Sequence, residues 1–150
     1  MRRAIALSRE KMRDDEGGPF GAVIVRDGVI IAEGWNQVTG HNDPTAHGEI
    51  VAIREACRAL GTFSLEGCTI YTSCEPCPMC LAAIYWSRID RVFYANTAAD
   101  AATIGFDDER LYRELALPPD ARSLPSERLL AAEARAVFDE WLADPDRVPY

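Results

Sequence analysis

The sequence predicts an α/β fold in which helices pack against a mixed sheet, and three observations support this. Strand-like and helix-like segments follow one another from Ala22 to Ala95 in the order β-β-α-β-α-β. The 150 residues suit one domain, which can bury roughly 70% of its unfolded surface. Hydrophobic residues make up 48% and charged residues 27%, which is ordinary for a globular protein and excludes general disorder.

The N-terminal segment, residues 1–16, is predicted to form a helix. Ile5 and Met12 share one face, and Gly17-Gly18-Pro19 end it. The apolar stretch stops at Leu7 and charged residues follow, so the segment lacks the hydrophobic region of a signal peptide. Nowhere does an apolar run approach the roughly 18 residues that a membrane span needs. We therefore expect a cytoplasmic protein.

A β-hairpin is predicted next. Two apolar runs, residues 22–25 and 29–32, flank Asp27-Gly28, and Asp-Gly is a strong signal for a tight hairpin turn. A polar loop follows at residues 36–45. The remaining core elements are a helix, a strand, a helix and a strand, predicted at residues 46–60, 68–72, 74–87 and 91–95.

Residues 117–150 are expected to form a distinct C-terminal segment of the single domain 1–150. Pro118-Pro119 and Pro125 predict a semi-rigid connector. Ser126 is predicted to cap a final helix that ends at Asp144-Pro145. The apolar face of that helix comprises Leu130, Val137, Phe138, Trp141 and Leu142.

The charge balance narrows the choice of substrate. The chain has 16 Lys+Arg against 24 Asp+Glu, a net charge of −8. Such a chain is poorly suited to gripping phosphate backbones over a broad face, so we expect a small-molecule substrate, no nucleic acid and no membrane partner. Lys11 is the single lysine, which argues against Schiff-base catalysis.

Two short segments carry the chemistry. These are His47-Gly48-Glu49 and, 28 positions after Glu49, Cys77-Pro78-Met79-Cys80. Each lies at the start of a predicted helix, where an imidazole and two thiolates can converge on one metal ion. Zinc suits such a ligand set, and three protein ligands leave a fourth tetrahedral position for water. Glu49, two residues from His47, would carry a proton from that water to a leaving amine. The pattern H-x-E…P-C-x-x-C is typical of zinc deaminases that act on nucleobases.

Other residues compete for these roles. Cys74 lies three residues before Cys77 and is the alternative ligand, although Pro76-Cys77 favours the later pair. His41 lies in a polar loop and is more simply a solvated residue. Cys57 and Cys68 fall on apolar faces typical of core positions.

The chain resembles bacterial guanine deaminases, a branch of the cytidine-deaminase-like superfamily, over nearly its whole length. The segments that carry the resemblance are Gly18–Val23, Asn42–His47, Tyr71–Cys80, Ala83–Trp86, Gly105–Asp108 and the terminal Tyr150. The resemblance implies a three-layer α/β/α sandwich with a central five-stranded mixed sheet. It also implies a homodimer whose protomers exchange their C-terminal segments.

By the same resemblance, His47, Cys77 and Cys80 would hold one zinc ion and Glu49 would shuttle protons. In one respect the chain departs from the family, because Gly48 stands where alanine is usual in H-x-E. Glycine costs up to about 1 kcal/mol within a helix, though less near an end.

The resemblance also implies the substrate contacts. Asn36 would hydrogen-bond to the purine and Phe20 would stack on it. Asp108, together with a Tyr150 reaching in from the other protomer, would bind the edge of guanine. Trp86 is expected to be partly core and partly pocket wall.

The implied activity is hydrolytic deamination of guanine to xanthine and ammonia. With the same chemistry, the substrate could be another free base or related heterocycle, such as cytosine or an aminotriazine. Deamination of adenosine in tRNA is disfavoured by the charge of −8. A non-catalytic module stabilised by zinc is the alternative from another class, and it has no use for Glu49.

Overall fold

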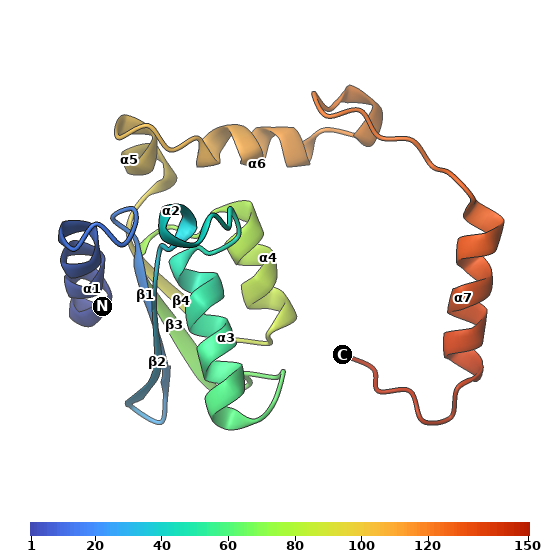
Figure 1. Ribbon diagram of the computed structural model, residues 1–150, viewed down its shortest axis with the longest axis horizontal. Coiled ribbons are helices and arrows are strands. Elements are labelled where there is room, and N and C mark those ends of the chain that lie inside the picture. Colours follow the sequence, from blue (N-terminus) through green and yellow to red (C-terminus); the bar gives the residue numbers. More distant parts are fainter. The chain divides into compact units, whose positions relative to one another are not determined.

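The computed structural model describes residues 1–150 and divides the chain into two compact units, Met1–Arg113 and Glu114–Tyr150. The first unit contains α1 (Arg2–Arg13), β1 (Gly21–Arg26), β2 (Val29–Trp35), α2 (Val38–His41), α3 (Gly48–Leu60), β3 (Cys68–Cys74), α4 (Pro78–Trp86), β4 (Arg91–Asn96) and α5 (Ala98–Thr103). Helix α6 (Asp108–Ala116) crosses the boundary, and η1 (Pro119–Ala121) and α7 (Ala131–Ala143) follow it (Figure 1).

The four strands form one mixed sheet in the order β2-β1-β3-β4. Strand β1 pairs antiparallel with β2 and β3, and β3 pairs parallel with β4. The predicted α/β class and mixed sheet are therefore confirmed. The count of five strands was wrong: after Asn96 the chain turns into α5, which Thr97 and Asp100 start with a reciprocal capping box. The four strands match the residue pattern, whereas the fifth came from the resemblance alone.

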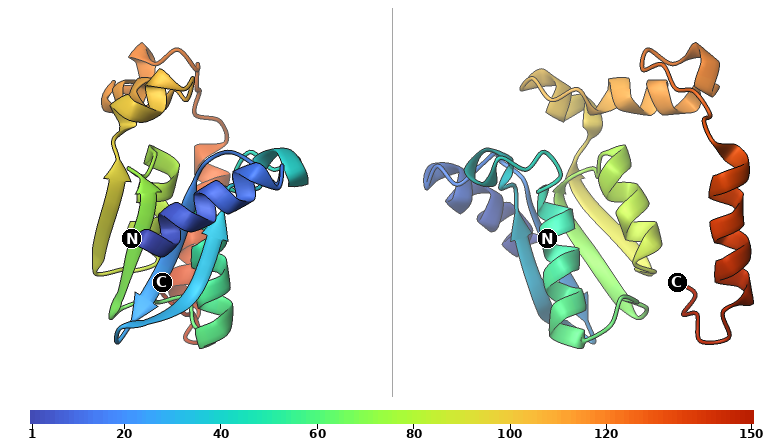
Figure 2. Two further views of the ribbon diagram at one scale, coloured as in Figure 1. Left: turned by 90° about the vertical axis from the view of Figure 1, so that its left-hand side faces the viewer. Right: turned by 45° about the vertical axis from the view of Figure 1, so that its right-hand side comes forward.

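Helices cover both faces of the sheet. Helix α1 lies on one face, and α3 and α4 lie on the other (Figures 1 and 2). The hydrophobic core includes Ile24 and Ile70 from the sheet and Ala52 and Ala56 from α3, all fully buried. This packing provides most of the driving force that holds α3 on the sheet.

Helix α3 approaches β2 closely because Gly34 has no side chain. A Cβ atom at Gly34 would lie 2.2 Å from the Gly48 carbonyl oxygen and 2.5 Å from the Ala52 nitrogen. Both distances are far below van der Waals contact. The glycine therefore fixes where the first turn of α3 lies, and with it the positions of His47 and Glu49.

An ion pair joins α1 to the edge of the sheet. The Arg3 guanidinium donates two hydrogen bonds to Glu33 of β2, both at 2.7 Å, and a third to Glu10 at 2.9 Å. Hydrogen bonding to Arg3 lowers the pKa of Glu33. The two side chains of the bidentate pair are 39% and 34% exposed, so water weakens the interaction.

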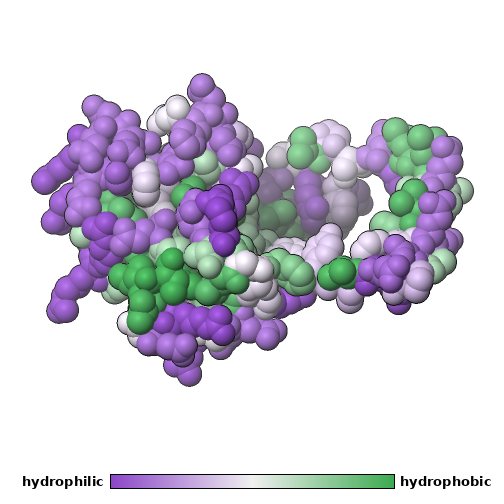
Figure 3. Space-filling view, turned by 60° about the horizontal axis from the view of Figure 1, so that its bottom comes forward, coloured by the Kyte–Doolittle hydropathy of each residue, from purple (hydrophilic) through white to green (hydrophobic).

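The second unit, Glu114–Tyr150, contains no buried residue. Figure 3 shows apolar side chains exposed on it among polar ones. They include Val137, Phe138, Trp141 and Leu142, which the sequence placed on one helix face. The predicted start at Ser126 was wrong, because α7 begins at Ala131 after Leu130, whose φ is 51°. Its end, before Asp144, agrees with the sequence. None of the helices of the chain is long and apolar enough to cross a bilayer.

Candidate active site

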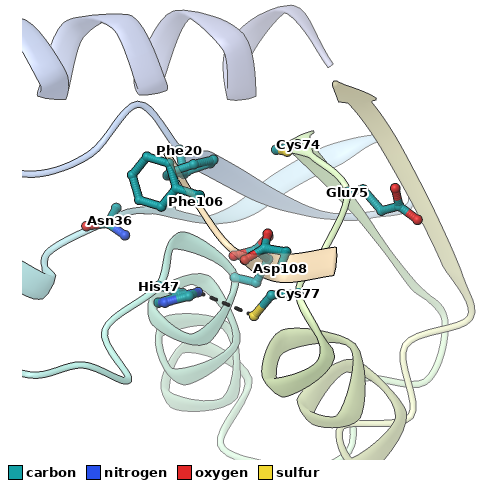
Figure 4. Close-up of a pocket in the computed structure, with 9 residues that line it drawn as sticks. Phe20, Asn36, His47, Cys74, Glu75, Cys77, Phe106 and Asp108 are labelled. Atoms are coloured by element: carbon teal, nitrogen blue, oxygen red, sulfur yellow. Dashed lines mark hydrogen bonds between the residues drawn. The ribbon is translucent and has the colours of Figure 1, made fainter. Parts of the chain in front are cut away.

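A cavity opens where α3, α4 and the loop before α6 meet the ends of β2 and β3 (Figure 4). The lining residues are Phe20, Asn36, His47, Glu49, Cys74, Glu75, Cys77, Phe106 and Asp108. Six of them were singled out from the sequence as candidate site residues: Phe20, Asn36, His47, Glu49, Cys77 and Asp108. The cavity therefore brings together residues from the first 110 positions of the chain.

His47 and Cys77 each occupy the N-cap of a helix, His47 on α3 and Cys77 on α4. Both have the extended backbone conformation usual for an N-cap residue, and neither side chain makes a capping hydrogen bond to its own helix. The His47 Nδ1 atom lies 3.6 Å from the Cys77 Sγ, the contact dashed in Figure 4, and 3.5 Å from the Cys80 Sγ. The three possible ligand atoms all lie within 4.8 Å of one another.

These distances fit a tetrahedral zinc ion. Zn–S bonds of about 2.3 Å and Zn–N bonds of about 2.0 Å place nitrogen and sulfur about 3.5 Å apart at a tetrahedral angle. The two N···S distances, 3.5 and 3.6 Å, match that value. One imidazole and two thiols are also a donor set that zinc prefers over harder cations.

The thiols are already arranged for metal binding by their own hydrogen bond. The contact with Cys80 lowers the pKa of Cys77 to about 4, with a further contribution from His47. The same contact raises the pKa of Cys80, and burial adds to that rise. The direction of the shift favours the thiolate of Cys77, the form in which cysteine binds metals.

Glu49 lies in the first turn of α3, beside the three ligand side chains, and lines the cavity. It is 8% exposed. Burial raises the pKa of its carboxyl group above the ordinary value. A raised pKa suits a group that must both accept and release a proton near neutral pH.

Cys74 ends β3 and lines the cavity, but it lies outside the cluster that could hold a metal. Its Sγ contacts the Thr97 carbonyl oxygen at 3.5 Å. Burial raises its pKa to about 11, so it stays a neutral thiol. The geometry thus favours Cys77 and Cys80 over Cys74 as ligands.

Asn36 follows β2 and is 6% exposed. Its Oδ1 accepts hydrogen bonds from the backbone N–H groups of Gly18 and Val38, each at 3.3 Å. Because the amide oxygen is engaged in this way, the amide NH₂ is the group left to donate to a ligand in the cavity.

Two phenylalanines form an aromatic wall of the cavity. The rings of Phe20 and Phe106 meet edge to face, with centroids 4.6 Å apart and an interplanar angle of 88°. Figure 4 shows them side by side. Phe106 lies in the segment Gly105–Asp108 that carries part of the resemblance, but no role was predicted for it. Its position two residues before Asp108 was the signal in the sequence that could have identified it.

Asp108 is the first residue of α6 and contributes a carboxylate to the cavity (Figure 4). Burial is the largest cause of its raised pKa, and the negative charge of Cys77 adds to it. Glu75, the third acidic lining residue beside Glu49 and Asp108, was not expected from the sequence; it accepts a hydrogen bond from the Ala98 N–H at 2.9 Å. It therefore holds the start of α5 in place.

Two predicted site residues are not brought to this cavity by the first unit. Trp86 is the last residue of α4, six positions or about 9 Å of helix beyond Cys80, and is 62% exposed. Tyr150 belongs to the second unit, Glu114–Tyr150, whereas the cavity lies in the first. The roles expected for both residues stay predictions.

Comparison with known proteins gives concordant matches. Residues 1–96 match the family model described as the cytidine and deoxycytidylate deaminase zinc-binding region, which confirms the prediction of zinc. The chain is 52% identical to the guanine deaminase of Bacillus subtilis (strain 168), over 94% of this chain and 90% of the relative. It is 47% identical to the tRNA-specific adenosine deaminase of Aquifex aeolicus, but only over 61% of each chain.

A solved structure agrees with the first of these relatives. The crystal structure of a guanine deaminase from Bacillus subtilis superposes with a TM-score of 0.96 at 50% identity. The alignment covers 99% of this chain and 95% of that one. The similarity therefore extends over the whole of both chains, including the segment after residue 96.

Proposed function

Because this chain belongs to the cytidine and deoxycytidylate deaminase zinc-binding family, we propose that it hydrolyses guanine to xanthine and ammonia. One observation carries the proposal. The buried carboxylate of Glu49 lines the same cavity as two of the three zinc-type ligands, and this cavity also has an aromatic wall and a fixed amide. The extent of the match to a guanine deaminase, 94% of the chain, favours guanine within the family.

The proton chemistry falls to Glu49. The chemistry that zinc supplies when bound is a nucleophilic water at neutral pH. Glu49 takes a proton from the attacking water and passes it to the ring nitrogen next to C2 of guanine. The hydroxyl group then bonded to C2 gives up its remaining proton, which Glu49 delivers to the exocyclic amine. The C–O bond at C2 forms, the exocyclic C–N bond breaks, and ammonia leaves with the proton that Glu49 carried.

Three side chains would hold the purine. Phe20 offers a ring face for stacking. The NH₂ group of Asn36 would donate to an acceptor on the purine edge, since its oxygen is engaged by backbone N–H groups. Asp108 would accept from the N–H groups of guanine, which carries donors where adenine has acceptors. Together they would fix the base with C2 toward Glu49.

The C-terminal segment is proposed to complete a homodimer. Residues 117–150 would be exchanged between protomers, because a segment of this length without buried residues cannot supply its own core. A second copy of the chain offers the apolar surface that α7 lacks. In that arrangement Tyr150 would close the site of the other protomer, and Trp86 would contribute to the pocket wall only across such an interface.

The five cysteines are all free. This fits a reducing compartment, and we place the enzyme in the cytoplasm. The tRNA-specific relatives share the zinc segments but match less of the chain, and the charge of −8 opposes binding to a polyanion. A free nucleobase therefore remains the favoured substrate class.

The experiment that tests the proposal is ammonia release from guanine by the zinc-loaded protein, with Glu49→Gln as the blank. We expect the substitution to retain zinc and to lower kcat at least about 10²-fold, the usual contribution of a general acid–base group. Glu55→Gln, a matched change at an exposed position of α3, should leave kcat unchanged. Turnover of cytosine, an aminotriazine or tRNA without turnover of guanine would show that guanine is not the substrate. Full activity of Glu49→Gln would contradict the mechanism.

A further inference from the structure

The start of α6 rests on the rest of the first unit through two side chains. Among residues 108–113, only Asp108 and Tyr112 are half-buried, and the others are exposed. The two residues are four positions apart, so they lie on the same face of the helix, one turn from each other. Asp108 lines the cavity (Figure 4), and Tyr112 follows it one helical turn later.

Tyr112 makes a hydrogen bond to the segment that carries the zinc ligands. Its hydroxyl group donates to the Pro76 carbonyl oxygen at 2.7 Å, across 36 residues of sequence. Pro76 is buried and directly precedes Cys77. The first helical bond of α4 is made by the next carbonyl, that of Cys77 with the Leu81 N–H. The Pro76 oxygen thus lies outside the helix, and Tyr112 satisfies it.

The other polar contacts of residues 108–113 are local to the helix. Arg110 pairs with Asp107 at 3.6 Å, Arg113 with Glu109 at 3.2 Å, and the Leu111 N–H donates to the Asp107 carbonyl oxygen. Contacts of this kind stabilise a helix but do not orient it on the fold. The hydrogen bond of Tyr112 is the one that can set how Asp108 faces the cavity.

We propose that Tyr112 is a positioning residue for substrate binding, whose hydroxyl group holds Asp108 toward the cavity by anchoring α6 to Pro76. The proposal rests on the proposed function, since it gives Asp108 the task of binding the base. The same hydrogen bond links the helix that carries Asp108 to the residue that precedes the ligand Cys77. Burial raises the pKa of the Tyr112 hydroxyl group, so it keeps its proton and remains a hydrogen-bond donor around neutral pH.

The test is a double-mutant cycle of Tyr112→Phe and Asp108→Asn. Tyr112→Phe keeps the ring and removes only the donor. We expect it to lower kcat/KM for guanine roughly five- to thirtyfold, because the lost hydrogen bond leaves the Pro76 oxygen unsatisfied. The loss should appear mainly in KM, since Asp108 would no longer be held in place to bind the base. Zinc content should remain that of the wild type. In the Asp108→Asn background the same change should cost less than about twofold. Tyr85→Phe, which removes an exposed hydroxyl group from α4, is the matched control and should change neither constant.

Each result decides between positioning and simple support of the fold. Wild-type kinetics for Tyr112→Phe, equal losses in both backgrounds, no effect of Asp108→Asn, or loss of zinc in proportion to activity would each overturn the proposal. The cycle is run on whichever base the wild type turns over. A wild type inactive on guanine but active on another base would therefore reject the proposed substrate, while the coupling between Tyr112 and Asp108 would still be measured.

Discussion

The His47 Nδ1 atom lies 3.6 Å from the Cys77 Sγ, although 30 residues separate them and each is the N-cap of a different helix. An N-cap side chain ordinarily accepts from the first N–H groups of its own helix, and neither residue does so. Each side chain instead contacts the side chain at the start of the other helix. The start of α3 and the start of α4 are therefore joined through the ligand set.

The first prediction separates Cys77 from Cys74 as a ligand. Cys77→Ala should lose its zinc, because it leaves one imidazole and one thiolate. Cys74→Ala should retain one zinc ion per chain, since the Cys74 thiol contacts the Thr97 carbonyl oxygen instead. Metal analysis of the two purified variants after dialysis measures this directly. Loss of zinc from Cys74→Ala with retention in Cys77→Ala would reverse the assignment.

The second prediction concerns the glycine in H-x-E. An alanine Cβ at Gly48 would lie 3.4 Å from the Gly34 and Phe20 carbonyl oxygens, which is ordinary contact. We expect Gly48→Ala to be accepted, to raise the free energy of unfolding by about 0.5 kcal/mol, and to leave kcat unchanged. Gly34→Ala is the contrasting variant, because its Cβ would overlap the α3 backbone. It should lower that free energy by at least about 2 kcal/mol. Thermal unfolding of the two variants and the wild type tests this prediction. Equal stability of Gly48→Ala and Gly34→Ala would refute it.

The third prediction tests the chain end. Deleting Tyr150 should raise KM for guanine and reduce kcat/KM at least about tenfold while zinc content stays constant. Tyr150→Phe, which keeps the ring, should recover part of the loss if the residue closes the pocket by packing. Steady-state kinetics and metal analysis on the same samples give both readouts. Unchanged kinetics after the deletion would mean that the tail does not reach the site.

The fourth prediction is a pH dependence of stability. Arg3 lowers the pKa of Glu33, so the pair stabilises the fold above the ordinary pKa of glutamate, near 4.5, and the contribution fades as pH falls through the lowered value. Glu33→Gln should destabilise the protein by about 0.5 kcal/mol at pH 7, a small value because both side chains are over a third exposed. Urea unfolding of both proteins at a series of pH values from 7 downward should show the difference shrink as the pH falls below 4.5. Glu66→Gln is the exposed control, and a difference independent of pH would rule the interpretation out.

The sequence was most informative where a local pattern carries the whole signal. The spacing of His47, Glu49, Cys77 and Cys80 depends on two helix starts, and both helices begin next to the expected residues. The hairpin at Asp27-Gly28 and the succession of the four strands along the chain follow from turn chemistry and apolar runs in the same way. Local periodicity is reliable there because burial on the sheet agrees with it.

The region after Asn96 was harder to predict because its helices are short and mostly exposed. Helix α5 begins with Thr97-x-x-Asp100, a capping box whose sequence could have been recognised. The start of α7 could not be placed, since Ser126 offers capping chemistry but residues 126–130 are exposed and gain nothing from packing as a helix. Cavity residues such as Phe106 depend on contacts distant in sequence, which no local pattern encodes.

The sheet ends on β4, and this has a consequence for how the protein behaves in concentrated solution. Strand β4 pairs only with β3, so a row of backbone N–H and C=O groups is left along its outer edge. Phe93 and Tyr94 on the same strand are 45% and 49% exposed. An uncovered edge with aromatic side chains is a template for adding strands from other molecules. A partner that covered β4 would also keep this edge from pairing with strands of other molecules.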